Sequence, residues 1–133
     1  MPTRWSAPEC FTKNKFTHKS DIWSYGVLLF EIFSFGEIPF DNYTNDNDVI
    51  DAVKTGADPG VPKDCQEEIA VIMPKCWDQT PEKRISAENI KCALDCIILA
   101  DVMQKCWTPE KRISAENVKR ELGNIGRMEQ EAK

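Results

Sequence analysis

The sequence predicts an all-α fold in which the last two helices of a helical unit occur twice. Three observations support this prediction. Residues 20–34 are apolar on almost every side, which is typical of a helix at the centre of a domain. Apolar residues recur at i, i+3, i+4 and i+7 over residues 69–76, the spacing of one helix face. Residues 69–97 and 99–125 are identical at 18 of 27 aligned positions.

Length, composition and charge narrow the class of protein. The 133 residues are enough for one domain with a core, and 41% hydrophobic with 29% charged residues is typical of a globular chain. The formal net charge of -5 argues against binding to nucleic acid or to an anionic membrane. We expect no membrane span, and the first residues lack the apolar core of a secretory signal.

The cysteines are expected to be reduced thiols in the cytoplasm, because nothing in the sequence indicates an oxidising compartment. No two of them have the C-x-x-C spacing and His18 is the only histidine, so no zinc site is expected. The six are Cys10, Cys65, Cys76, Cys92, Cys96 and Cys106.

The first helix is expected over residues 20–34, with Ser20 as its N-cap. Gly26 lies inside this helix, where glycine costs about 1 kcal/mol relative to alanine. Its presence indicates that another part of the chain approaches closely at this point.

The second helix is expected from Asn45 to Thr55, with Asn45 as the N-cap and Gly56 just past the end. Several aspartates stand in or near its first turns. They lack the spacing of a calcium loop and are interpreted as a solvated acidic face. They are Asp41, Asp46, Asp48 and Asp51.

The third helix covers residues 69–76 and is expected to begin at a capping box formed by Asp64 and Glu67. Pro74 contradicts the pattern, because proline inside a helix removes a backbone hydrogen bond at a cost of about 3 kcal/mol. Thr80 then resembles an N-cap followed by a proline, and Ser86 is expected to cap a fourth helix.

The repeat divides the chain into residues 1–97, a second copy of the last helix-loop-helix unit over 98–125, and a polar tail over 126–133. Two copies are too few for a solenoid, so we interpret the repeat as one duplicated unit. A recent duplication and an error in assembling the gene both explain it.

Three segments carry motifs that can be compared with known proteins. Residues 4–9 are Arg-Trp-Ser-Ala-Pro-Glu, residues 21–26 are Asp-Ile-Trp-Ser-Tyr-Gly, and residues 76–84 contain Cys-Trp and Pro-Glu-Lys-Arg. In this order they resemble the end of the activation loop, the start of the long central helix and the last block of the C-terminal lobe of protein tyrosine kinases. The tryptophan at residue 5 and the Cys-Trp pair favour the tyrosine branch, with non-receptor cytoplasmic kinases as the nearest group. The likeness covers residues 2 to about 97 and implies a helical C-lobe fragment of a protein kinase-like fold.

The resemblance implies a buried ion pair between Glu9 and Arg84. The repeat offers Arg112 as a second partner, but seven positions separate Trp77 from Arg84, as in the family, and five separate Trp107 from Arg112. We therefore expect Arg84 to pair with Glu9. One departure from the family is Ile85, which replaces the proline expected after the arginine.

The resemblance also gives roles to residues near the N-terminus. Asp21 matches the aspartate that anchors the catalytic loop, although a carboxylate at a helix start needs no such role. Pro2, Arg4 and Trp5 match the loop beside the substrate tyrosine. A core aromatic is the alternative interpretation of Trp5.

The family's ATP and catalytic-loop motifs do not occur in the 133 residues. In intact kinases, ATP and magnesium are held by four motifs: the glycine-rich loop, the strand lysine, H-R-D and D-F-G. None of them occurs in this sequence. No cofactor is therefore expected in this chain, and we expect it to be inactive alone. The alternatives are a non-catalytic module that binds a protein substrate or regulator, and a gene fragment with no role of its own.

An uncovered central helix has consequences for partners. A helix that is apolar all round leaves a large exposed hydrophobic patch unless another part of the chain or a partner covers it. Part of residues 86–107 is one candidate cover, and self-association through this helix is another.

Overall fold

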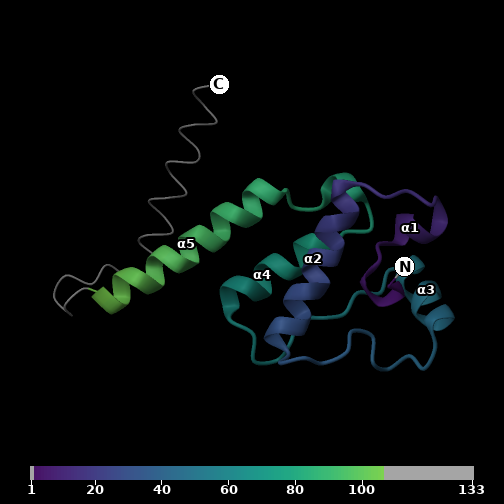
Figure 1. Cartoon of the computed structure of the whole chain (residues 1–133), viewed down its shortest axis with the longest axis horizontal. Coiled ribbons are helices and arrows are strands. Elements are labelled where there is room, and N and C mark those ends of the chain that lie inside the picture. Colours follow the sequence, from purple (N-terminus) through teal and green to yellow (C-terminus); the bar gives the residue numbers. More distant parts are fainter. Residues whose placement is uncertain (1, 107–133) are drawn as a thin grey trace, which may run out of the picture. The chain divides into compact units, whose positions relative to one another are not determined.

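The computed structural model describes residues 2–106, shown in colour in Figure 1. This part of the chain is helical and contains no strand, which confirms the all-α prediction. The chain divides into two compact units, residues 1–87 and 88–133. The second copy from Trp107 onward, Arg112 and the polar tail lie outside the described residues. The helices are α1 (Pro8–Thr12), α2 (His18–Phe33), α3 (Asp46–Lys54), α4 (Glu67–Cys76) and α5 (Ala87–Cys106), with 3-10 turns η1 (Thr3–Trp5) and η2 (Pro81–Lys83).

Helix α2 begins two residues earlier than the sequence suggested, because its N-cap is Thr17 and not Ser20. The Thr17 Oγ1 accepts from the Lys19 and Ser20 amides over 3.2 and 3.4 Å. The Ser20 Oγ accepts in return from the Thr17 amide over 3.2 Å. Ser20 is therefore the third helical residue of a capping box.

Helices α2 and α4 approach each other most closely at Gly26. A Cβ at this position would lie 2.6 Å from the Cys76 Cβ and 2.6 Å from the Trp77 Nε1. The close approach that Gly26 indicated is thus confirmed. Trp23 and Met73 are completely buried in the core of this unit.

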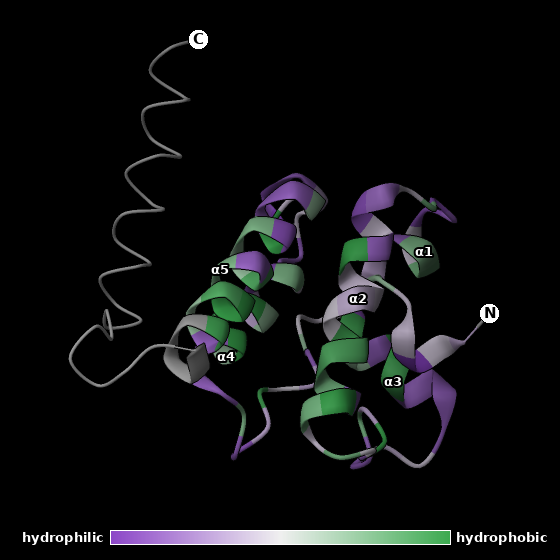
Figure 2. Cartoon of the chain, turned by 60° about the vertical axis from the view of Figure 1, so that its left-hand side comes forward, coloured by the Kyte–Doolittle hydropathy of each residue, from purple (hydrophilic) through white to green (hydrophobic). Residues whose placement is uncertain are grey.

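The other side of α2 is exposed, as expected for a central helix that lacks its cover, and not buried as a helix at the centre of a domain would be. Leu28, Ile32 and Phe35 are 45%, 56% and 92% exposed. Their spacing places them along one stripe of the helix and the turn after it. The second half of α2 is almost entirely hydrophobic (Figure 2), and α4 covers only part of that surface.

Helix α3 agrees with its predicted range. The Asn45 Oδ1 accepts from the Asp48 amide over 2.9 Å, and the helix buries Val49 and Val53. Past its end, Gly56 has a φ of +108°. In the described part of the chain, no three His, Cys, Asp or Glu side chains gather as metal ligands would.

Helix α4 begins at Glu67 with Gln66 as its N-cap, and no side chain caps it. The expected capping box of Asp64 and Glu67 is therefore wrong, since the N-cap is Gln66, two positions after Asp64. Pro74 lies inside the last turn, and the helix continues to Cys76. The chain then turns into η2, where Pro81 takes the first position but the Thr80 side chain makes no cap bond.

Helix α5 belongs almost entirely to the second unit and runs without a break past residue 97, where the first repeat copy ends. On its surface, Lys91 and Asp95 form an exposed ion pair of 3.0 Å. None of the described helices combines the length and the apolar character needed to cross a membrane.

Candidate functional site

The centre of the first unit is an ion pair between residues 75 positions apart. The Arg84 Nη1 donates to the Glu9 Oε1 over 2.7 Å, and its Nη2 donates to the Oε2 over 2.8 Å. Glu9 lies in α1 and is 7% exposed, and Arg84 follows η2 and is 2% exposed. Two parallel charge-assisted bonds fix both groups in one plane.

Backbone and hydroxyl groups satisfy the remaining atoms of the pair. The Arg84 Nε donates to the Asp78 carbonyl and its Nη1 to the Lys19 carbonyl, both over 2.8 Å. The Ser20 hydroxyl donates to the Glu9 Oε1 over 2.9 Å. The guanidinium also lies 5.2 Å from the ring centre of Trp23, within cation-π range. Each nitrogen of the Arg84 guanidinium and each oxygen of the Glu9 carboxylate therefore has a hydrogen-bond partner, which compensates for the burial of the two charges.

The surroundings of Glu9 change its pKa in two directions. Burial raises it, whereas hydrogen bonds from Arg84, the backbone and Ser20, together with the positive charge of Arg84, lower it. The lowering contributions prevail, so the pKa of Glu9 lies below its ordinary value of 4.5. The carboxylate is ionised at neutral pH, as a pair with Arg84 requires.

Arg4 attaches the N-terminal segment to the loop between α2 and α3. Its Nη1 donates to the Pro39 and Phe40 carbonyls over 2.9 and 2.7 Å, and its Nη2 donates to the Tyr43 carbonyl over 3.0 Å. Pro2, at the start of this segment, is exposed. The Pro2 carbonyl nevertheless accepts from the Trp5 amide over 3.2 Å and from the Ser6 hydroxyl over 2.9 Å. Residues 2–5 are therefore bonded at both ends.

Trp5 is half-buried and bonded at both its ring and its backbone. Its Nε1 donates to the Glu31 Oε2 over 2.9 Å, and its carbonyl accepts from the Ser24 hydroxyl over 2.8 Å. Both partners lie on α2. The indole therefore fixes the end of residues 2–5 against the central helix.

Asp21 lies in the first turn of α2 with its side chain exposed. The structure brings Glu9 and Arg84 together and places Arg4 and Trp5 in one segment. Asp21 stands apart from both groups, at the positive end of a helix.

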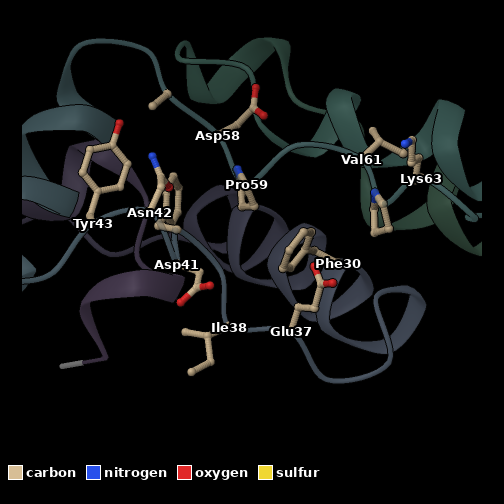
Figure 3. Close-up of a pocket in the computed structure, with 13 residues that line it drawn as sticks. Phe30, Glu37, Ile38, Asp41, Asn42, Tyr43, Asp58, Pro59, Val61 and Lys63 are labelled. Atoms are coloured by element: carbon tan, nitrogen blue, oxygen red, sulfur yellow. The ribbon is translucent and has the colours of Figure 1, made fainter.

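Sequence reasoning missed a hollow of about 380 Å³ in the first unit (Figure 3). It lies between residues 37–43, which follow α2, and residues 57–63, which follow α3. Two loops that are distant in sequence form it, so no local pattern could have indicated it.

The described cysteines are free thiols in different environments. Cys10 and Cys76 are buried, and Cys92 is exposed. Burial raises the pKa of Cys76 to about 11, an effect that the nearby charge of Arg84 only partly opposes. Cys76 is therefore a packing residue with almost no thiolate at neutral pH.

Comparisons with known proteins agree with the resemblance. A family model for protein tyrosine and serine/threonine kinases matches residues 1–94. The chain is 43% identical over 91 residues to the tyrosine protein-kinase src-1 of Caenorhabditis elegans, over 68% of this chain and 17% of that protein. It is 42% identical over 84 residues to the tyrosine-protein kinase Fer of Rattus norvegicus, over 63% of this chain and 10% of that protein. The chain thus spans between 10% and 17% of the length of these relatives.

Proposed function

Because the chain belongs to the protein tyrosine and serine/threonine kinase family, we propose that it supplies the substrate-side loop and the helical C-lobe core of a tyrosine kinase domain. In the intact domain the reaction is ATP-dependent phosphoryl transfer to a protein tyrosine. Similarity to src-1 and Fer supports the tyrosine branch. As part of the same proposal, we assign the chain to a non-receptor kinase of the cytoplasm.

The observation that carries this proposal is the buried pair of Glu9 and Arg84. It joins the segment of residues 4–9 to the block of residues 76–84, and these are two of the three segments that resemble tyrosine kinases. Arg4 holds residues 2–5 to the loop after α2, and Trp5 holds them to α2 itself. This arrangement supports a substrate-side loop mounted on a fixed core.

The exposed stripe of Leu28, Ile32 and Phe35 supports a role within a larger domain. Exposed apolar stripes of this kind mark surfaces that pack against something else. We propose that the remainder of a kinase domain covers the stripe. The competing explanation is that two copies associate through α2. The mass of the chain in solution distinguishes these explanations, because self-association predicts the mass of a dimer.

We propose that this chain alone transfers no phosphoryl group. The sequence supports this limit on activity, because the glycine-rich loop, H-R-D and D-F-G, which hold ATP and magnesium in intact kinases, do not occur in the 133 residues.

Two assays test the proposal. The 133-residue chain, mixed with Mg-ATP and a tyrosine-containing peptide, is expected to give no turnover; sustained phosphorylation would overturn the claim of inactivity. In a second assay, residues 2–94 replace the matching region of the src-1 kinase. We expect this chimera to phosphorylate tyrosine peptides and not serine peptides. A folded chimera that prefers serine would contradict the tyrosine assignment.

The alternative function is a non-catalytic module that binds a protein substrate or regulator. The observation that favours it is the hollow between residues 37–43 and 57–63, which is large enough to hold a few side chains.

A further inference from the structure

The hollow is lined by charged and polar residues, with apolar residues among them. Figure 3 shows Glu37 and Asp41 along one side and Asp58 across from them. Lys63 is the one cationic residue among those that line it. Three carboxylates against one ammonium give the hollow a negative balance.

Two of these carboxylates are available to a ligand. Glu37 and Asp41 are exposed, and neither side chain has a hydrogen-bond or ion-pair partner within the described residues. Asp58 differs, because its Oδ1 accepts from the Gly60 amide over 2.9 Å. A bound cationic group would therefore meet Glu37 and Asp41 without displacing any protein contact.

Most of the exposed lining of the hollow is polar, and its apolar part is small. Phe30 and Phe40 line the hollow but are almost fully buried, so Ile38 and Val61, which are exposed, offer the apolar surface beside these charges. Two prolines, Pro59 and Pro62, complete the apolar lining. The site thus combines a place for a positive charge with a place for an aliphatic side chain.

The wall formed by residues 37–43 is held in position before any ligand arrives. The carbonyls of Pro39, Phe40 and Tyr43 all accept from Arg4. Phe40 has a φ of +58°, a left-handed conformation that is costly for a bulky residue and that the Arg4 bonds help to hold. A wall held in this way loses little freedom on binding, which favours affinity.

We propose that this hollow docks an extended segment of a protein partner in which an arginine or lysine stands next to a bulky aliphatic residue. The basic group faces Glu37 and Asp41, and its neighbour packs against Ile38 and Val61. An acidic segment is repelled by the same carboxylates. This docking is independent of phosphoryl transfer, so it holds or fails separately from the proposed function.

The test begins with peptide selection on the full 133-residue chain. Random octapeptides are selected against the immobilised chain, and one selected peptide is labelled with fluorescein and measured by fluorescence anisotropy. We expect enrichment of arginine or lysine beside leucine, isoleucine or valine, and weaker binding as the ionic strength rises.

Paired variants localise the binding. The double variant E37Q/D41N removes both free carboxylates and is expected to weaken binding by about fivefold, the size typical of two exposed charge contacts. The control D51N/E82Q makes the same charge change at two exposed residues outside the hollow and is expected to change binding less than about twofold.

A third variant, Lys63→Glu, adds a carboxylate to the hollow and is expected to tighten binding. It keeps the test decisive if circular dichroism shows that E37Q/D41N is unfolded. The proposal is overturned if no peptide is selected or if the selected peptides lack basic residues. It is equally overturned if E37Q/D41N and D51N/E82Q weaken binding alike, or if Lys63→Glu leaves it unchanged.

Discussion

Glu9 and Arg84 meet as two planar groups, and each terminal nitrogen of the guanidinium donates to one oxygen of the carboxylate. Neither lysine in place of Arg84 nor glutamine in place of Glu9 keeps this contact, since lysine lacks the fork and glutamine lacks the charge. The pair connects α1 to the segment after η2. It is also hydrogen-bonded to the first turn of α2, through the Lys19 carbonyl and the Ser20 hydroxyl.

Replacing Glu9 with glutamine is expected to lower the free energy of unfolding by about 3 to 5 kcal/mol, because Arg84 is left buried without a counter-charge. Urea unfolding at neutral pH measures the loss. Glu82→Gln is the control, since Glu82 is exposed and its replacement is expected to cost less than about 0.5 kcal/mol. Equal losses in the two variants would show that the pair contributes no stability of its own.

The pH dependence of stability has a definite sign. The pKa of Glu9 is lowered from 4.5 by folding, so its contribution is fully present above pH 4.5 and is lost as the pH falls through the lowered value. Unfolding curves measured from neutral to acid pH check this. The difference between the wild type and Glu9→Gln should shrink as the pH falls below 4.5, and a constant difference would contradict the lowered pKa.

Gly26→Ala tests the contact between α2 and α4. The new methyl group would lie 2.6 Å from the Cys76 Cβ, so the helices must separate. Overpacking of this kind costs about 1 to 3 kcal/mol, and the better helix propensity of alanine returns about 1 kcal/mol. We expect a net loss in thermal or urea unfolding. Ile32→Ala, on the exposed stripe, is the comparison and should have a smaller effect.

The cysteines should react in a fixed order. Cys92 is exposed, whereas Cys76 is buried with its pKa raised to about 11. Iodoacetamide at a mildly alkaline pH should therefore label Cys92 in the native chain and Cys76 only after unfolding. Peptide mass spectrometry measures both. Labelling of Cys76 as fast as Cys92 in native buffer would mean that the contact of α2 with α4 opens readily.

Local signals predicted the positions of the helices better than the residues that cap them. Asn45 caps α3 through an amide three residues away, so its sequence position was sufficient. Gly26 was informative because glycine is unfavourable in a helix and needs a reason. The cap of α2 was misplaced because the apolar run begins after Ser20, while the helix itself begins in the polar residues that follow Thr17.

Contacts across the chain were less predictable. The pairing of Glu9 with Arg84 came only from the family resemblance, since no local pattern links residues 75 positions apart. The Arg4 contacts had no signal, because their acceptors are backbone carbonyls that every residue carries. The exposure of Leu28 and Ile32 could not be derived from periodicity, because periodicity shows that a surface is apolar and not which part of a protein covers it.

The Ser20 hydroxyl takes part in two structures at once. It accepts from the Thr17 amide in the cap of α2, and it donates to the Glu9 carboxylate in the ion pair. Fraying of the first turn of α2 would therefore also weaken the ion pair. Opening of this helix end alone thus has a high free-energy cost. In amide hydrogen exchange, the first turn of α2 should behave as part of the slowest cooperative unit, although helix ends ordinarily exchange fast.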